Sequence, residues 1–187
     1  MDKTNLNELR DRAYQNAVKH GWYKKKDTGI HDVMMIITEL SESINADRKR
    51  NRANRKLFEK NIKTPQPNQE EHFHFCYDVL MKDSVEDELA DAFIRSLSLL
   101  GAKGKDMDPD YFTDESVNIM IGFMLQEEGF VEQIFSIVYT LITEEEIFIA
   151  MTRMLALAVI LYIDLLWHVE QKMKYNEMRP YKHGKLY

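Results

Sequence analysis

The chain contains very little cysteine, proline or glycine. Its 187 residues include one Cys, four Pro and seven Gly. The single thiol, Cys76, cannot form an intramolecular disulfide, and it excludes an iron–sulfur cluster or a zinc site built of several thiolates. With 44% hydrophobic and 30% charged residues, the composition is typical of a helical globular protein of a reducing compartment. We therefore expect a cytoplasmic location.

Long apolar runs and an excess of positive charge are also missing. The most hydrophobic segment, MLALAVILYIDLLW, follows Arg153 and is interrupted by Asp164, so we expect a buried core helix rather than a membrane span. The segment MDKTNLNELRDRAYQ has no apolar stretch that would predict a secretory signal. The formal net charge of −6 argues against a broad nucleic-acid-binding surface, because phosphates require clustered cations. We expect neither a membrane nor a nucleic acid as a partner.

Hydrophobic periodicity predicts one all-α domain over 1–187, a bundle of about five or six helices. The helical patterns cover approximately residues 5–20, 31–50, 84–100, 110–128, 131–141 and 144–179. Thr143 and Glu146 form a possible capping box before the last of them. The pattern fails over 51–78, where NIKTPQPNQ contains two prolines. We predict an insertion or a long loop there.

Two of the predicted helices each carry a pair of acids three residues apart. Glu39 and Glu42 lie off the apolar stripe of the second helix, and Glu88 and Asp91 lie opposite the stripe of the third. Either pair alone is typical of a solvated face, on which Asp91 pairs with Arg95 one turn later. If the two helices are neighbours, four carboxylates face one cleft, and their repulsion requires a cation. Oxygen ligands favour Mg²⁺, with Mn²⁺ as a substitute.

Other patterns for metal binding or nucleophilic catalysis are weaker. A carboxylate-bridged di-iron site in a helical bundle needs two Glu-x-x-His motifs, and the chain has one, Glu71 with His74. His72 and His74 form a His-x-His pair without a third ligand at a useful spacing. Cys76 lies among aromatic residues in FHFCYDV, which is typical of a buried thiol rather than an activated one.

Cations gather in the segment QKMKYNEMRPYKHGKLY. On a helical wheel Lys172, Asn176 and Arg179 share an arc of roughly 60°, whereas Lys174 points away. Such a set suits phosphate oxygens, although cations at a helix end also complement the helix dipole while they remain solvated. Acids for Mg²⁺ and cations for phosphates are together the two halves of a polyphosphate site.

The order of these motifs resembles the MazG-like branch of the all-α nucleoside triphosphate pyrophosphohydrolases. The similarity lies in GWYKKKDTG, MMIITELSESINADRKR, VEDELADAFIRSL and KYNEMRPYKHGK, and no motif is matched between residues 101 and 168. Thr38 stands where the family motif Glu-Glu-x-x-Glu begins with an acid. The two acid pairs are also farther apart than is usual, by about the length of 51–78.

The resemblance implies a MazG-like architecture and a hydrolase that cuts a nucleoside triphosphate between its α and β phosphates. Such an enzyme would serve to clean the nucleotide pool and would form a homodimer or a homotetramer. The implied Mg²⁺ ligands are Glu39, Glu42, Glu88 and Asp91, and either Glu39 or Glu42 would accept the proton of the attacking water.

The resemblance also implies residues that contact the substrate. The phosphates would meet Lys172, Asn176 and Arg179, with Lys182 and Lys185 as weaker candidates. Trp22 matches an aromatic position near the cleft and would stack on the base, although a tryptophan after a glycine also packs at helix ends. The alternative is a non-catalytic helical module that binds a nucleotide or a partner protein.

Overall fold

The computed structural model describes residues 5–23, 29–144 and 146–181. Within these ranges the chain is all-α, as predicted, and contains no β-strand. The described residues form nine α-helices rather than five or six: α1 (Leu6–Lys19), α2 (Ile30–Arg48), α3 (Arg55–Ile62), α4 (Gln69–Leu80), α5 (Val85–Ala102), α6 (Asp114–Met124), α7 (Phe130–Tyr139), α8 (Ile147–Ile160) and α9 (Leu165–Glu177). Two short elements are the 3₁₀ turn η1 (Pro109–Phe112) and the π-helical turn η2 (Thr140–Glu144).

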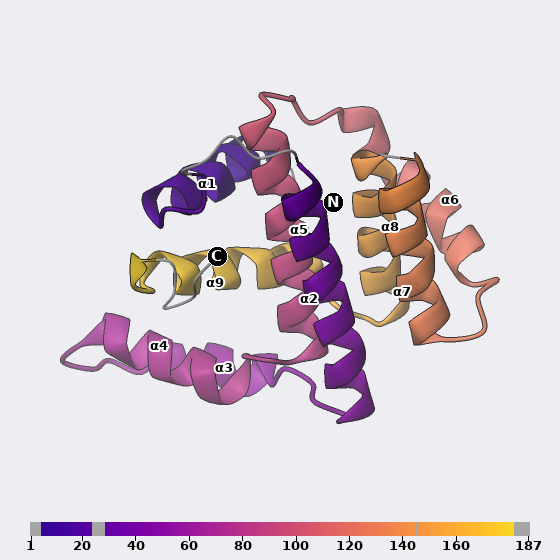
Figure 1. The fold of residues 1–187 in the computed structure, drawn as a ribbon. Helices are drawn as coiled ribbons and strands as arrows, with labels where there is room; N and C mark the ends of the chain where they lie inside the picture. Colours follow the sequence, from indigo (N-terminus) through magenta and orange to yellow (C-terminus); the bar gives the residue numbers. More distant parts are fainter. Residues whose placement is uncertain (1–4, 24–28, 145, 182–187) are drawn as a thin grey trace.

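Helix α5 lies at the centre of the molecule. Helix α2 runs beside it in the opposite direction, α1 and α9 pack against one side, and α7 and α8 lie on the other (Figure 1). Because neighbours surround α5, it buries its predicted apolar stripe of Leu89, Phe93 and Leu97 completely. It also buries the acids of its first turn, so the arc opposite the stripe does not face open solvent.

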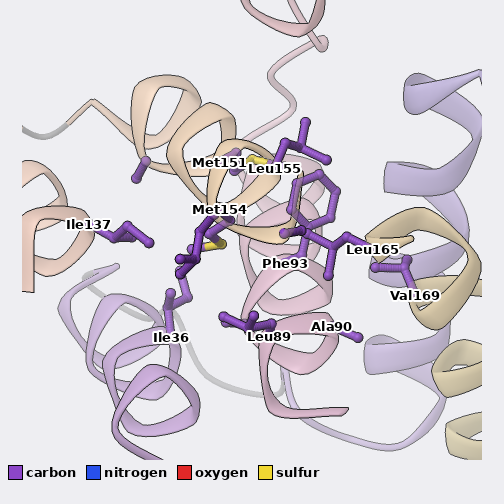
Figure 2. Packing of buried hydrophobic residues seen from close by; sticks show 14 of the residues in the cluster. Ile36, Leu89, Ala90, Phe93, Ile137, Met151, Met154, Leu155, Leu165 and Val169 are labelled. Carbon is purple, nitrogen blue, oxygen red and sulfur yellow. The ribbon is translucent and has the colours of Figure 1, made fainter. Parts of the chain in front are cut away.

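The main hydrophobic core joins α5 to the helices around it. Figure 2 shows Ile36 of α2, Phe93 of α5, Ile137 of α7, Met154 of α8 and Val169 of α9 gathered in this core. Helix α8 is buried along most of its length, which confirms the prediction of a core helix for this hydrophobic segment. No single described helix is long and apolar enough to span a membrane, and α8 with α9 meets these criteria only as a pair bent by 109°.

The single helix predicted over 144–179 is broken into α8 and α9. Tyr162 interrupts it with a φ of 59°, in the left-handed region that few residues other than glycine adopt. Asp164 then caps α9, because its side chain accepts a hydrogen bond from the backbone N–H of Trp167 at 3.3 Å. The predicted capping box is absent: Thr143 lies in η2 and donates its hydroxyl to the carbonyl of Tyr139.

The segment 51–78, predicted as an insertion or long loop, contains most of a helical hairpin formed by α3 and α4. Asn54 caps α3 and Asn68 caps α4, and both prolines lie in the connection between them. The two helices are only 8 and 12 residues long, which is why no extended periodicity marks them. They form a second hydrophobic cluster against α9, made of Phe58, Phe73, Cys76, Tyr77, Met81 and Tyr175.

Candidate functional site

A cavity of about 600 Å³ lies between α1, α2, α5 and α9. It brings together side chains that are far apart in the sequence. Every residue of the sequence-predicted site that the structure describes lines this cavity: Trp22, Glu39, Glu42, Glu88, Asp91, Lys172, Asn176 and Arg179. The remaining two predicted residues, Lys182 and Lys185, lie outside the described residues.

The carboxylates of α2 and α5 converge in the cavity. Glu39, Glu42 and Glu88 each offer an oxygen within 4.8 Å of the others. Glu39 is 4% exposed and Glu88 is 5% exposed, so these two acids do not belong to ordinary solvated faces. Asp91 is partly buried, and Glu42 is exposed. Three acids this close, two of them buried, form a cluster that a bound cation would stabilise.

Burial and mutual repulsion alter the protonation of this cluster. Burial, together with the charge of Asp91, raises the pKa of Glu39 to about 7. Burial and the neighbouring Asp87 raise the pKa of Glu88 to about 9. The Arg95 guanidinium limits the shift at Glu39, to which its Nε donates a hydrogen bond at 2.6 Å. Arg95 thus pairs across to α2, rather than with Asp91 on its own helix as one sequence interpretation had it.

Lys172 is buried and contacts two carboxylates. Its Nζ lies 2.8 Å from Oδ1 of Asp87 and 2.9 Å from Oδ2 of Asp91. Burial alone would lower the pKa of Lys172, but these two acids raise it well above its ordinary value. The ammonium therefore stays charged, and in this structure its donors are directed at Asp87 and Asp91.

Asn176 holds the other oxygen of Asp91. Its Nδ2 donates to Oδ1 of Asp91 at 3.4 Å. Although burial opposes ionisation, Lys172 and Arg95 lower the pKa of Asp91 below its ordinary value. The Oδ1 of Asn176 is buried and has no hydrogen-bond partner among the described residues. A buried amide oxygen without a donor beside a group of carboxylates fits the oxygen ligands that Mg²⁺ takes.

The sequence around the start of α5 explains why the acids of its first turn lie here. Ser84 is the N-cap, and its hydroxyl accepts a hydrogen bond from the backbone N–H of Asp87 at 3.2 Å. The positive end of the helix dipole therefore lies beside Asp87 and Glu88, and it offsets part of the cost of burying them. Thr38 also lines the cavity, but its hydroxyl donates to the carbonyl of Met34 at 3.0 Å.

The opposite part of the cavity wall is built around the end of α1. The two ring nitrogens of His20 lie 2.8 Å and 3.0 Å from the carbonyl oxygens of Asn16 and Arg179, so His20 ties α1 to the end of α9. Gly21 follows with a φ of +84°, and a Cβ there would lie 2.2 Å from the hydroxyl oxygen of Tyr181. Any side chain at this position would strain the backbone and displace the Tyr181 ring, so glycine fits best. The turn places Trp22 in the cavity wall.

Two further polar groups line this part of the wall. Tyr23 accepts a hydrogen bond from the hydroxyl of Ser98 at 3.1 Å, and burial raises the pKa of Tyr23 to about 12. The Oδ1 of Asn16 is buried without a hydrogen-bond partner among the described residues. The wall therefore combines aromatic rings with a free hydrogen-bond acceptor. Asn16, His20 and Tyr23 were not predicted from the sequence, which marks them only as the end of a helix.

The weaker sequence patterns do not form a cluster of metal ligands among the described residues, although Sγ of Cys76 lies 3.6 Å from Nε2 of His72. His72 contacts the carbonyl of Asn61 through Nε2 at 3.1 Å, and His74 lies 3.0 Å from Asp78. Within the described ranges, the clusters of potential metal ligands are acidic and include no histidine. Cys76 is buried, as predicted, and burial raises the pKa of its thiol.

Asp87 is the acid that sequence reasoning missed. It is 1% exposed and bonds to Lys172, so it helps to set the charge of the cavity wall without lining it. The stretch DSVEDELAD contains two acid pairs with the same three-residue offset, Asp83–Glu86 and Glu88–Asp91, and Asp87 belongs to neither. Its position three residues after a serine N-cap was the available signal.

Comparison with protein-family models, curated proteins and solved structures finds no match to this chain. The functional assignment therefore rests on the residues themselves. The donor set fits Mg²⁺, because carboxylates from two helices and a free amide oxygen share one cavity with Arg179.

Proposed function

We propose that this protein is a MazG-like, Mg²⁺-dependent hydrolase that cleaves a nucleoside triphosphate between its α and β phosphates, releasing the monophosphate and pyrophosphate. One observation carries the proposal: acids from α2 and α5 meet Asn176 and Arg179 of the α9 region in a single cavity. Mg²⁺ and the phosphates of a triphosphate are the pair of ligands that such a combination suits. Cleaning of the nucleotide pool is the cellular role that we propose for it.

The proposed cation ligands are Glu39, Glu42, Glu88 and Asp91. When bound there, Mg²⁺ (or Mn²⁺ in its place) supplies Lewis acidity and neutralises phosphate charge. The buried carboxylates hold one face of the site, and exposed Glu42 lies where solvent enters. Protonated Glu88 would release its proton as the cation binds, because metal ligands must be deprotonated.

Glu39 is our choice over Glu42 as the group that accepts the proton of the attacking water. Glu39 is buried whereas Glu42 is exposed, and burial raises the pKa of Glu39 to about 7 in the metal-free chain, nearer to that of an efficient general base. Water oxygen would form a bond to the α-phosphorus, the bond from that phosphorus to the α–β bridging oxygen would break, and pyrophosphate would leave. Arg179 offers a guanidinium to the departing charge, and Asn176 offers an amide.

The base would occupy the wall near the end of α1. Trp22 supplies an aromatic ring for stacking, and Oδ1 of Asn16 is free to accept a hydrogen bond from a base. In this scheme Lys172 does not have the role that the resemblance implied, which was contact with the phosphates. Its short contacts with Asp87 and Asp91 support a role in holding the acids, with phosphate contact left to Arg179.

The test is a panel of ribo- and deoxyribonucleoside triphosphates incubated with the purified chain and Mg²⁺, with products separated by ion-exchange chromatography. We expect monophosphate and pyrophosphate in equal amounts, and no reaction in chelator. Release of orthophosphate with the diphosphate would place the cut at another bond and contradict the proposal. No turnover of any nucleotide would also contradict it.

A non-catalytic interaction module is the second candidate, and exposed apolar side chains favour it. Val131, Phe135 and Tyr139 recur every four residues on α7 and are about half exposed or more. Such a stripe suits a protein interface. A second copy of the chain would reconcile the stripe with the enzymatic proposal, since we also propose a homodimer or homotetramer. Binding of a nucleotide without turnover would favour the module alone.

A further inference from the structure

Asp87 is a buried acid beside the cavity that the proposed reaction leaves without a role. Three donors from different parts of the chain surround its carboxylate. The Tyr77 hydroxyl donates at 2.6 Å to Oδ1, while the backbone N–H of Asp83 and Nζ of Lys172 each donate at 2.9 Å to Oδ2. Both oxygens are thus engaged by the protein, and Asp87 is not among the residues that line the cavity. Asp83, Asp87 and Glu88 also offer oxygens within 4.8 Å of one another. Because protein donors already occupy both oxygens of Asp87, however, it is badly placed to be a metal ligand.

The charge of Asp87 matters to the cavity through Lys172. The ammonium lies between Asp87 and Asp91, so one positive charge is shared by two negative ones. With both carboxylates ionised and the ammonium protonated, the three groups together carry a charge of −1. If Asp87 were neutral, the charge of Lys172 would cancel the charge of Asp91. Of the two acids, Asp91 is the one that lines the cavity. The attraction of this part of the wall for a cation would then be largely lost.

The position of Tyr77 is set by the α3–α4 hairpin. Its ring is buried, lies edge-on to Phe58 with centroids 5.8 Å apart, and stacks on Tyr175 at 4.4 Å. The hydroxyl therefore reaches Asp87 from a ring that has little freedom to move. The α3–α4 hairpin lies between the two acid pairs in the sequence. Through the contact of Tyr77 with Asp87, it supports the proposed cation site from the side away from the cavity.

We propose that Asp87 and Tyr77 are positioning residues of the cation site, which set its affinity for Mg²⁺ by holding Lys172 between Asp87 and Asp91. The inference rests on the Mg²⁺ site of the proposed function, but it does not depend on nucleotide turnover. Groups that bond to metal ligands rather than to the metal typically alter metal affinity about 10–100-fold.

The experiment measures the dissociation constant for Mg²⁺ by isothermal titration calorimetry on the full chain without nucleotide. For Asp87→Asn we expect binding weaker by about 10–100-fold. Tyr77→Phe, which keeps the ring and its packing, should weaken binding in the same direction by less. Asp78→Asn is the matched control, because Asp78 also accepts a hydrogen bond from a tyrosine hydroxyl, that of Tyr175 at 2.6 Å, and shows no contact with Lys172. It should leave Mg²⁺ affinity unchanged.

A charge-balanced double variant separates positioning from mere structural support. Asp87→Asn combined with Lys172→Met removes one charge of each sign and leaves Asp91 negative. We expect it to recover part of the Mg²⁺ affinity that Asp87→Asn loses. Lower melting temperatures with unchanged Mg²⁺ dissociation constants would show a structural role only and overturn the proposal. Tyr77→Phe keeps the test decisive if Asp87→Asn fails to fold.

Turnover measured on the same samples distinguishes this inference from the proposed function. A wild-type chain that binds Mg²⁺ and shows the expected variant pattern, but cleaves no nucleotide, overturns the proposed function and supports the positioning role. A chain that cleaves nucleotides with equal Mg²⁺ affinity in every variant overturns the positioning role alone. A wild-type chain that does not bind Mg²⁺ overturns both.

Discussion

The two sides of α5 differ in what they bury and what they expose. On the side of α1, α2 and α9, buried Glu39, Glu88 and Lys172 surround a cavity. On the side of α6–α8, the buried side chains are mostly apolar, and large apolar side chains such as Phe135 and Ile142 are exposed. One helix therefore separates a wall of buried charge from a layer with exposed apolar surface.

This difference indicates that the two sides serve different functions. Buried carboxylates weaken a fold unless a partner offsets their charge, so a chain that keeps several in one cavity gains something other than stability. Exposed apolar surface costs solubility in an isolated chain and is typical of an interface. We therefore expect substitutions on the cavity side to change ligand binding first, and substitutions on the α6–α8 side to change folding or association.

The largest effect that we expect is the loss of turnover in Glu88→Gln. It removes a proposed cation ligand while leaving a side chain of the same shape, and we expect turnover to fall at least about a thousandfold, roughly 4 kcal/mol. Glu88 in the metal-free chain is protonated at neutral pH, so glutamine should leave the melting temperature in chelator nearly unchanged. Melting curves and turnover assays, each with and without Mg²⁺, measure both effects.

The control for Glu88→Gln is Glu115→Gln, which alters an exposed acid of α6 that does not line the cavity. In the wild type, Mg²⁺ at about 100 times its dissociation constant should add about 2.7 kcal/mol of stability, and Glu88→Gln should lose most of that gain. Equal stabilisation of both proteins by Mg²⁺ would show that the acids do not form one cation site.

Neighbouring residues on α5 allow the two sides to be compared directly. Phe93 is fully buried in the core, whereas Ile94 is partly buried and lines the cavity. Phe93→Ala should lower the free energy of unfolding by about 3–5 kcal/mol, because it leaves a cavity in a packed interior. Ile94→Ala should cost roughly 1 kcal/mol, because solvent already reaches the site. Urea denaturation measures both, and equal losses would mean that the cavity side is packed as tightly as the core.

The stability of the metal-free chain should fall as pH rises from 7 to 9, above the range in which the lowered pKa of His168, about 4 instead of 6.5, acts in the opposite direction. Glu39 and Glu88 have pKa values of about 7 and about 9 when folded, above the ordinary value of 4.5. Between these pH values the folded state holds protons that the unfolded state has released. The stability that these two acids contribute is fully present below pH 4.5 and is lost as pH rises through 7 and 9. The slope is at most about 1.4 kcal/mol per pH unit for each proton.

Thermal melts in chelator between pH 5 and 9 measure this loss, with Glu88→Gln as the comparison. Glutamine does not ionise, so the variant should show a shallower decline at alkaline pH. Mg²⁺ should stabilise the wild type more strongly as pH rises, because it competes with those protons. A metal-free chain that becomes more stable from pH 7 to 9 would mean that ionising Glu39 and Glu88 does not destabilise the folded state.

The exposed stripe of α7 tests the other side of the comparison. Phe135 is 64% exposed, and Phe135→Ser should weaken self-association by about 2 kcal/mol if it lies at the centre of a contact between copies. Analytical ultracentrifugation over a range of concentrations measures the shift. Leu57→Ser alters an exposed apolar residue of α3, away from the stripe, and should have no effect. A wild-type chain that is monomeric at every concentration would show that a second copy of the chain does not cover this stripe.

Much of the fold could be predicted, because α1, α2, α5 and α7 carry periodic patterns between clear end signals. Each begins and ends within about two residues of its predicted bounds. The prediction failed where local signals were weak. The hairpin is short and packs through tertiary contacts such as Phe58 on Tyr77. The break at Tyr162 is a single left-handed residue inside an apolar run, which no periodicity reveals.

The candidate site was predictable in membership and less so in its pairings. Spacing alone put Glu39 with Glu42 and Glu88 with Asp91, and the structure brings both pairs to one cavity. A helical wheel also put Lys172 on the arc of Asn176 and Arg179, and all three line the cavity, but the wheel cannot say which charge the ammonium contacts. Asp87 is 85 residues away in the sequence from Lys172, so their contact depends on how α5 and α9 pack. That packing is a tertiary property.

The smallest effect that we expect is that of Lys174→Ala, which removes a cation from α9 on the side away from the cavity. Lys174 is exposed, does not line the cavity, and holds its ammonium 4.2 Å from the ring centroid of Phe73. Its loss should cost about 0.5–1 kcal/mol of unfolding free energy, the size of an exposed cation–π contact. Turnover and Mg²⁺ affinity should stay at the wild-type level, with Lys56→Ala, an exposed lysine of α3, as the control for net charge. A marked loss of triphosphate affinity in Lys174→Ala alone would mean that the opposite face of α9 meets the substrate. The contrast between the cavity side of α5 and the rest of the molecule would then be wrong for α9.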